Sequence, residues 1–418
     1  MRVFLKTFGC SLNRADTESI THLIKEHHLE IVDSEAEADA VVVNTCTVRG
    51  ETEEKVLRYL SSLRGKRLLV TGCMAAVQPG LIACNFPQCS IVSANNMDCI
   101  IGALEKKVIS VGSGGSPPPP APFSRGLVYT IPISRGCLGE CTYCIVRLAR
   151  RTLVSTPPST ILTMTEKAVA SGALEIRFTA QDTGVYGLDI GTSLHSLLRS
   201  ASAITGRFKI RVGMFNPSSI SSFLNDLLNC YHSNKIYKFA HMPLQSGSDK
   251  ILESMRRGYN SEDFIKIVRR FRQEFPWMTL ATDVIVGYPG ELEEDFKNTL
   301  DLLRLLEPDK IHASRFSPRP HTPAASLKQV PEPVKKERSR IMSSLRLSIQ
   351  NERNKRWVGK EVEATVVEHK RGVGLLARTD EYKSVLIKED HPLLLGSRVF
   401  LEIIACSPFR LVGSVIRR

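Results

Sequence analysis

The chain has 418 residues, 42% of them hydrophobic and 24% charged, an ordinary composition for a globular protein of roughly two to four domains. No segment reads as a secretory signal and no apolar stretch approaches ~18 residues, so we expect no membrane span. Eleven cysteines without an export signal favour a reducing, cytoplasmic location, where thiols serve metals or chemistry rather than disulfides. The net charge of +13 favours a polyanionic partner, above all nucleic acid.

Residues 1–111 predict an N-terminal α/β domain with a mostly parallel sheet. The strand-like runs VFLKTFG, AVVVNTC, RLLVTGC and SIVSAN alternate with amphipathic helical segments. Three strands end at a cysteine: Cys10, Cys46 and Cys73. Because the carboxyl ends of parallel strands meet at one edge, these thiols are expected to converge on a second three-cysteine iron–sulfur site. The remaining cysteines outside the motif described below are expected to be packing residues: Cys84, Cys89, Cys99, Cys230 and Cys406.

Residues 112–126 are rich in Gly, Ser and Pro and predict an interdomain linker. From residue 127 the alternation of strands and helices resumes, with strand-like runs such as EIRFTAQ, KIRVGMF and LATDVIVGYP. Six strand–helix units predict a complete or partial barrel, whose active site would gather at the carboxyl ends of the strands. Several of these ends carry polar residues and glycine, in TAQDTG, GMFNP, HMPLQSGSD and VGYPGE.

Cys137, Cys141 and Cys144 follow the first of these strands with the spacing C-x3-C-x2-C. Three thiolates so close together can hold three corners of a [4Fe–4S] cube and leave the fourth iron open to a small molecule. A zinc site would normally need a fourth protein ligand nearby, but the next His is His195 and the next Cys is Cys230. Structural or zinc-bound thiols remain the alternative.

The end of the central domain predicts a basic helix over residues 333–356. Residues 331–356 carry eight Lys or Arg against three Glu. The helix is either a solvated amphipathic helix with Ile341, Leu345 and Leu347 inward or a basic surface near nucleic acid. Residues 357–418 predict five short strands in an OB-like barrel, which is either a structural cap or an RNA-binding module.

Nearly the whole chain resembles the radical S-adenosylmethionine (SAM) methylthiotransferases that modify tRNA. The N-terminal blocks of that family are similar to KTFGCSLNRADTE, VVNTCTVRGETEEKV and VTGCMAAVQP, its radical SAM signature to ISRGCLGECTYCIV, and its TRAM domain to the C-terminal barrel. RFTAQDTGVYGLD and RVGMFNP are most similar to the archaeal and eukaryotic branch, which acts on N6-threonylcarbamoyladenosine at tRNA position 37. The resemblance implies a methylthiotransferase domain at 1–111, a radical SAM domain at 127–356 and a TRAM domain at 357–418.

The resemblance also implies SAM and two [4Fe–4S] clusters as cofactors. The cluster on Cys137, Cys141 and Cys144 would bind SAM and, once reduced, yield a radical that removes hydrogen from carbon 2 of the adenine. The cluster on Cys10, Cys46 and Cys73 would deliver the sulfur or methylthio group, and a second SAM would supply the methyl group. The catalytic chemistry is therefore expected to lie in the clusters and SAM rather than in acid–base residues.

The resemblance and the strand ends predict residues that contact SAM, with Tyr143 beside the adenine and Gln181 and Asp182 at the amino group or ribose. A capped strand end is the alternative role for Gln181 and Asp182. Arg315 and Arg319 would meet a SAM carboxylate or an RNA phosphate, since Arg suits both. The remaining residues at the predicted rim are Asn216, Gln245, Ser246 and Asp283.

The expected partners are the tRNA anticodon loop and an electron donor such as ferredoxin or flavodoxin, with the sulfur donor left open. Departures from the family pattern are Arg147 after the signature, Arg150-Arg151 in place of an Arg-Gly pair, and His321 where Gly is usual. They bear on loop geometry and RNA contacts. The alternative functions are a radical SAM methylthiotransferase acting on a ribosomal protein or on isopentenyladenosine tRNA, and a non-enzymatic RNA-binding iron–sulfur protein.

Overall fold

The computed structural model describes residues 1–63, 65–112, 120–123, 126–370, 372–388 and 394–417. The chain forms two compact units: unit 1 contains residues 1–122, 130–154 and 317–326, and unit 2 contains residues 123–129, 155–316 and 327–418. Most of the predicted linker, at residues 113–119 and 124–125, lies outside the described residues. The domain boundaries read from the sequence therefore stay a prediction.

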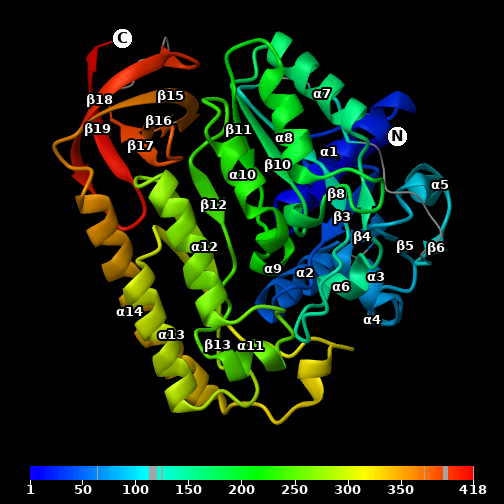
Figure 1. Cartoon of the computed structure of the whole chain (residues 1–418). Coiled ribbons are helices and arrows are strands. Elements are labelled where there is room, and N and C mark those ends of the chain that lie inside the picture. Colours follow the sequence, from blue (N-terminus) through cyan, green and yellow to red (C-terminus); the bar gives the residue numbers. More distant parts are fainter. Residues whose placement is uncertain (64, 113–119, 124–125, 371, 389–393, 418) are drawn as a thin grey trace. The chain divides into compact units, whose positions relative to one another are not determined.

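Unit 1 is built on a six-stranded sheet of order β2-β1-β3-β4-β5-β6, in which every pairing is parallel (Figure 1, blue to cyan). The strands are β1 Arg2–Thr7, β2 Glu30–Ile31, β3 Ala40–Thr45, β4 Arg67–Gly72, β5 Ser90–Ser93 and β6 Ile109–Ser110. The helices between them are α1 Ser11–Glu26, η1 Glu35–Glu37, α2 Gly50–Ser62, α3 Cys73–Val77, α4 Pro79–Asn85, η2 Met97–Cys99 and α5 Ile100–Glu105.

Both faces of this sheet are buried, which explains why its strands read as continuous apolar runs. Alternate residues of β3 divide between the two faces: Val41 and Val43 pack in one cluster, and Ala40 and Val42 pack in the other. The first cluster lies under α2 and α4, and the second under α1 and α5. The predicted parallel α/β sheet is confirmed.

Three further segments complete unit 1. They are β8 Ser134–Arg135, α6 Val146–Ala149 and η5 Pro323–Ser326. β7 Val128–Pro132 and β9 Val154–Ser155 carry the chain across the boundaries between the units. Ala324 donates its backbone N–H to the carbonyl of Thr142, and this bond fixes η5 to the loop of the cysteine motif.

The central part of unit 2 contains parallel strands in two three-stranded sheets, β11-β10-β7 and β12-β13-β14. A parallel bridge between Ile210 and Ile236 links β11 to the segment before β12. The strands are β10 Glu175–Thr179, β11 Lys209–Val212, β12 Phe239–His241, β13 Thr279–Val286 and β14 Lys310–Arg315. The helices are α7 Pro158–Ala170, η3 Thr183–Val185, α8 Leu194–Ala203, α9 Pro217–Ile220, η4 Ser221–Phe223, α10 Leu224–Tyr231, α11 Asp249–Ser254, α12 Ser261–Glu274 and α13 Glu293–Leu306.

The C-terminal part of unit 2 is a closed five-stranded barrel of order β15-β16-β17-β19-β18 (Figure 1, orange to red). Its strands are β15 Glu361–Lys370, β16 Gly374–Thr379, β17 Ser384–Ile387, β18 Arg398–Cys406 and β19 Leu411–Arg417. Tyr382 fixes the barrel to the central strands, because its hydroxyl donates to the fully buried carboxylate of Glu175 at 3.0 Å. The predicted combination of an N-terminal parallel sheet, a central α/β part and a small C-terminal β-barrel is confirmed.

The basic helix α14 runs from Glu332 to Lys355. Ile341, Leu345 and Leu347 are half-buried, and the buried face also carries cations. Arg338 pairs with Glu291 at 2.8 Å, and Arg353 pairs with Asp309 at 3.2 Å. Part of the positive charge of α14 is therefore neutralised inside unit 2. None of the helices within the described ranges is both long enough and apolar enough to cross a membrane.

Candidate cluster and cofactor sites

The structure brings Cys10, Cys46 and Cys73 together at the carboxyl edge of the N-terminal sheet. Cys46 and Cys73 directly follow β3 and β4, and Cys10 lies three residues after the end of β1. The side-chain oxygen of Asn13 lies 4.0 Å from the Cys10 sulfur and 3.9 Å from the Cys73 sulfur. The amide of Asn13 donates to the carbonyl of Thr45 at 3.0 Å, next to Cys46. Asn13, which sequence reasoning missed, thus lies at the centre of the three cysteines.

Two glycines allow the backbone to turn into these cysteines. Gly9 has φ +118° and Gly72 has φ +93°, values in the left-handed region that side chains disfavour. A Cβ on Gly9 would lie 2.9 Å from the Cβ of Cys46, and one on Gly72 would collide with the backbone of Thr45. Glycine at both positions therefore makes the close approach of the three strand ends possible.

The thiols differ in their exposure to solvent. Cys10 is exposed, whereas Cys46 and Cys73 are buried. Burial, and to a smaller extent the nearby Cys73 and Cys10, raise the pKa of the Cys46 thiol to about 11. Burial also raises the pKa of Cys73, although Arg150 opposes the shift. Metal binding would have to displace the protons of these thiols, because thiolates are the ligands.

A buried ion network connects this site to the cysteine motif within unit 1. Asp16 of α1 is fully buried and pairs with Arg135 of β8 at 2.5 Å and with Arg150, which follows α6. The Arg150 side chain also hydrogen-bonds Cys73. Arg150 itself is 2% exposed. The two arginines thus join α1 to the chain segments on either side of the motif.

The motif cysteines Cys137, Cys141 and Cys144 lie in the loop between β8 and α6, all partly exposed. A Cβ on Gly139 would lie 3.3 Å from the Cys137 sulfur and 3.8 Å from the Cys141 sulfur, so both sulfurs face this glycine. Within the described ranges, no three His, Cys, Asp or Glu side chains surround the position of one metal ion. A [4Fe–4S] cube places each thiolate on a different iron, so its ligands need not meet at one point.

A second network that the sequence did not predict lies beside Cys46. Arg319 is 5% exposed, forms an ion pair with Glu53 and donates to the hydroxyl of Thr47 at 3.0 Å. Gln78, five residues after Cys73, donates to the same hydroxyl at 2.8 Å and to Glu53 at 2.6 Å. In this structure Arg319 therefore supports the N-terminal cysteine site, and its predicted contact with SAM or RNA stays a prediction.

Seven of the predicted SAM residues belong to unit 2, and two of them carry buried oxygens that lack a partner. The side-chain carbonyl oxygens of Gln181 and Gln245 have no hydrogen-bond donor among the described residues. Gln245 also adopts φ +67°, which is strained for a residue with a side chain. Buried acceptors without donors are costly unless a ligand satisfies them. Both residues fit a ligand that carries a protonated amine, as SAM does.

Asp182 and Asn216 are engaged within the protein. The Asp182 carboxylate accepts from the backbone N–H groups of Gly184 at 2.9 Å and Asn216 at 3.1 Å, and from the Ser219 hydroxyl at 2.6 Å. The side-chain oxygen of Asn216 accepts from Arg257 at 3.1 Å. These contacts are those of a capped strand end, so Asp182 holds the β10 and β11 ends in place.

The other predicted residues differ in their surroundings. Ser246 is 1% exposed and accepts from the backbone N–H of Ser248 at 3.2 Å. Asp283 pairs with His241 at 2.8 Å; burial alone would raise the pKa of Asp283, but the His241 bond and charge lower it. Arg315 pairs with Glu332 at 2.8 Å. Tyr143 belongs to unit 1 and is half-buried in the motif loop. The assignment of all eight residues to SAM stays a prediction.

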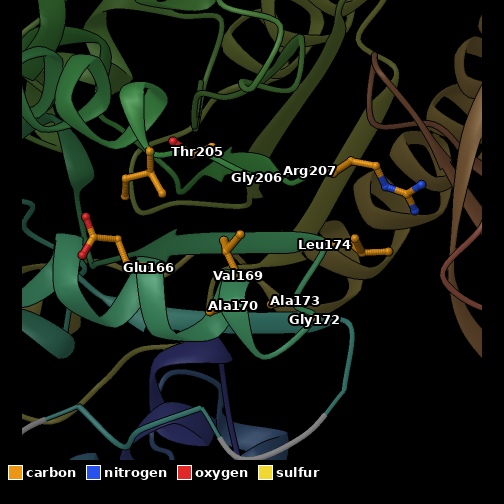
Figure 2. A pocket seen from close by; sticks show the side chains of 10 residues that line it. Glu166, Val169, Ala170, Gly172, Ala173, Leu174, Thr205, Gly206 and Arg207 are labelled. Carbon is orange, nitrogen blue, oxygen red and sulfur yellow. The ribbon is translucent and has the colours of Figure 1, made fainter.

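Several cavities are lined by residues of a single unit. One of about 310 Å³ in unit 1 is lined by Arg135, Arg150 and Arg151 together with Asn95. Another of about 520 Å³ in unit 2 lies beside α7, with Glu166 at one end and Arg207 at the other (Figure 2). None of the predicted site residues lines the second cavity, and most of its lining is small or apolar. It is a surface hollow rather than a candidate site.

Comparisons with known proteins agree with this arrangement. Residues 2–94 match the model described as "Uncharacterized protein family UPF0004", and residues 131–303 match the radical SAM superfamily. The fold is similar to that of TsrM from Kitasatospora setae, a radical SAM methyltransferase solved with cobalamin and a [4Fe–4S] cluster, with a TM-score of 0.57 and 15% identity. The match covers 78% of this chain and 77% of TsrM.

Full-length relatives give the family. A probable threonylcarbamoyladenosine tRNA methylthiotransferase from Pyrococcus horikoshii is 41% identical, over 93% of this chain and 94% of its own length. The threonylcarbamoyladenosine tRNA methylthiotransferase of Drosophila melanogaster is 32% identical, over 99% of this chain and 78% of its own length. The chain therefore belongs to the radical SAM family of threonylcarbamoyladenosine tRNA methylthiotransferases.

Proposed function

We propose that this chain inserts a methylthio group at carbon 2 of N6-threonylcarbamoyladenosine at position 37 of tRNA. The observation that carries the proposal is that two sets of three cysteines lie in one compact unit, in a chain whose relatives bear the name of this reaction. Such a reaction needs one site that generates a radical and another that holds sulfur, and each set of cysteines would serve one of them. Nothing favours the ribosomal-protein, isopentenyladenosine or non-enzymatic alternatives.

The cofactors are SAM and [4Fe–4S] clusters. When bound, they supply the radical chemistry that breaks a C–H bond which ordinary acid–base residues cannot break. Cys137, Cys141 and Cys144 would ligate the cluster that binds SAM, since three thiolates leave one iron open. The second cluster would be held by three residues at the N-terminal sheet edge, Cys10, Cys46 and Cys73.

Protein side chains would orient SAM rather than react with it. The unpartnered oxygens of Gln181 and Gln245 would accept hydrogen bonds from its amino group. The Asp182 carboxylate would act indirectly, by holding the end of β10, which carries Gln181, against the end of β11. Tyr143, half-buried in the motif loop, would lie beside the adenine.

The substrate is a tRNA, and its anticodon loop would present the modified base. The net charge of +13 suits a polyanion. The C-terminal barrel would contact the body of the tRNA, while an unpaired loop base is splayed into the part-barrel. We further propose a cytoplasmic reaction that draws its electrons from a ferredoxin or flavodoxin.

The first test measures iron and acid-labile sulfide in anaerobically reconstituted protein, together with SAM cleavage under dithionite. About eight irons per chain and release of 5′-deoxyadenosine are expected, because two four-iron clusters are required. Methylthio product is then assayed by mass spectrometry of digested tRNA. Zinc in place of iron, with no SAM cleavage, would overturn the enzyme assignment.

Cysteine variants separate the two sites. Cys141→Ala should abolish SAM cleavage and leave about four irons. Cys46→Ala should retain deoxyadenosine formation and lose methylthio product. Cys84→Ala is the matched control, because this exposed thiol of α4 belongs to neither set and should leave both activities intact. Methylthio product from Cys46→Ala would remove the second set from the sulfur chemistry.

A further inference from the structure

The central strands of unit 2 carry a row of charged side chains on one face. Along each strand successive side chains point to opposite faces. One set is apolar and 1% exposed or less: Ile176, Phe178, Ile210, Val212, Leu280, Val284 and Ile311. The alternate positions form what we name the charged face: Arg177, Arg211, His241, Asp283, Lys310 and His312. Sequence reasoning missed this face, although EIRFT and KIRV show the alternation.

The charged face is continuous across the strands. Arg177 and Arg211 are paired neighbours in β10 and β11, and Asp283 and His312 are paired neighbours in β13 and β14. The Arg211 guanidinium lies 4.9 Å from the centre of the Phe239 ring on β12, which joins the two sheets. The rings of His241 and His312 lie 5.8 Å apart. The six residues therefore surround one region of the part-barrel.

Positive charge exceeds negative charge on this face. Arg177 pairs with Glu175 at 2.5 Å, and His241 pairs with Asp283 at 2.8 Å. Arg211 and Lys310 have no carboxylate or other hydrogen-bond acceptor among the residues that the structure describes, and both contact the Tyr382 ring instead, at 6.0 and 5.9 Å. Arg378 lies against the same ring at 4.4 Å. Three cations thus surround one aromatic ring.

Such crowding of like charges is unfavourable unless an anion joins them. Burial, and to a smaller extent the nearby Arg378, Lys383 and Arg211, lower the pKa of Lys310 to about 8, although Asp309 opposes the shift. The face is also accessible, because His312 is exposed and the Arg177 side chain is 35% exposed. Glu175, on the same side of β10, pairs with Arg177 and lies 3.8 Å from Arg378. Among the described residues, Arg211 and Lys310 are therefore the cations of this open face that no carboxylate pairs with.

We infer that Arg211, supported by Lys310, binds the carboxylate of the threonyl substituent on the target base and so makes the enzyme specific for threonylcarbamoyladenosine. The inference rests on the proposed function. Unmodified adenosine has no such carboxylate. A guanidinium can grip a carboxylate through two parallel N–H bonds, and the Phe239 and Tyr382 rings fix its position. When a base is splayed out of the RNA, the base enters a pocket and its phosphates stay at the rim. A carboxylate on the base can therefore reach the charged face on the strands more easily than a backbone phosphate can.

The test compares two tRNAs that differ only in the threonylcarbamoyl group at position 37. Their dissociation constants are measured by anaerobic fluorescence anisotropy with reconstituted full-length protein at fixed salt. Wild-type protein should bind the modified tRNA more tightly. Arg211→Gln should weaken binding of the modified tRNA by about ten- to a hundredfold, because a charged bidentate contact is lost, and leave the unmodified tRNA nearly unchanged. Arg211→Lys should give an intermediate loss.

Two further variants test a second residue of the charged face and provide a control. Lys310→Gln should reduce the preference in the same direction, by a smaller factor. Arg199→Gln, on the exposed side of α8, is the matched control and should leave the preference intact. Thermal unfolding of each variant shows whether the fold is retained, and the conservative Arg211→Lys keeps the inference testable if Arg211→Gln unfolds.

Other outcomes would overturn the inference. Equal weakening of both tRNAs, with a smaller salt dependence, would assign Arg211 to a backbone phosphate. Weaker SAM binding by equilibrium dialysis without tRNA would assign it to the SAM carboxylate. An unchanged preference in Arg211→Gln would remove any role in specificity. Failure of wild-type protein to modify threonylcarbamoyladenosine tRNA would instead defeat the proposed function itself.

Discussion

Asp16 is the residue whose replacement tests the architecture of unit 1 most directly. Its carboxylate is fully buried, and its two partners are buried as well, the Arg135 side chain being 9% exposed and that of Arg150 1% exposed. Asp16→Asn keeps the shape of the side chain but removes the negative charge that both guanidinium groups share. Two buried cations would then have lost the carboxylate that lies between them.

Removing one partner of a buried ion pair typically costs about 3 to 5 kcal/mol, whereas the intact pair need not be strongly stabilising. We therefore expect Asp16→Asn to lower the free energy of unfolding by about 3 to 5 kcal/mol, a factor of roughly a hundred to a few thousand in the folding equilibrium. The assay is equilibrium urea unfolding of the anaerobic apoprotein, followed by circular dichroism.

Asp39→Asn is the matched control in the same unit. Asp39 pairs with Arg2 at 3.1 Å, but both side chains are about half exposed, at 47% and 48%. Solvent and salt screen such a pair, so its loss should leave the urea midpoint unchanged within error. Equal midpoints for Asp16→Asn and Asp39→Asn would refute the argument that the buried network holds the motif segment to α1.

Three other predictions concern single contacts. Gly72→Ala should reduce bound iron from about eight to about four per chain, because a Cβ would collide with the Thr45 backbone beside Cys46; full iron content would show that the strand end can shift. Tyr382→Phe removes a hydrogen bond to the buried Glu175 carboxylate and should lower stability by about 1.5 to 3 kcal/mol in thermal unfolding, with an unchanged transition speaking against this anchor. The pKa of Asp283 is lowered in the folded state, so its stabilising contribution is present above its unfolded pKa of about 3.9 and is lost as the pH falls below that value. Asp283→Asn should therefore lose less stability than wild type between about pH 5 and pH 3, and parallel curves for the two proteins would contradict this.

Local sequence patterns predicted the strands and the convergence of the cysteines because both depend on short-range periodicity. Each of Cys10, Cys46 and Cys73 follows a run typical of a strand, and parallel strands bring their ends together. The ligand assignment does not follow from this pattern alone, so it rests on the resemblance and stays open to the iron measurement.

Pairings between distant residues were not predictable from the same patterns. Asp16 meets Arg150 from 134 positions away, and Arg319 meets Glu53 from 266 positions away. Neither pairing has a periodic signal. The sequence also could not show how much of the positive charge of α14 is exposed. A count of Lys and Arg does not reveal that Arg338 and Arg353 are buried against carboxylates. Excess charge in the sequence therefore overstates the positive surface available to tRNA.

The network around Asp16 also bears on modularity. The match to the N-terminal family model ends at residue 94, which suggests an independent domain. Yet its buried Asp16 obtains both of its counter-ions from residues 135 and 150. A gene fragment cut at the proline-rich segment would leave a lone carboxylate in its core, so the block could not be transplanted onto another protein without the cysteine loop that follows it. The two cysteine sets therefore belong to one folding unit.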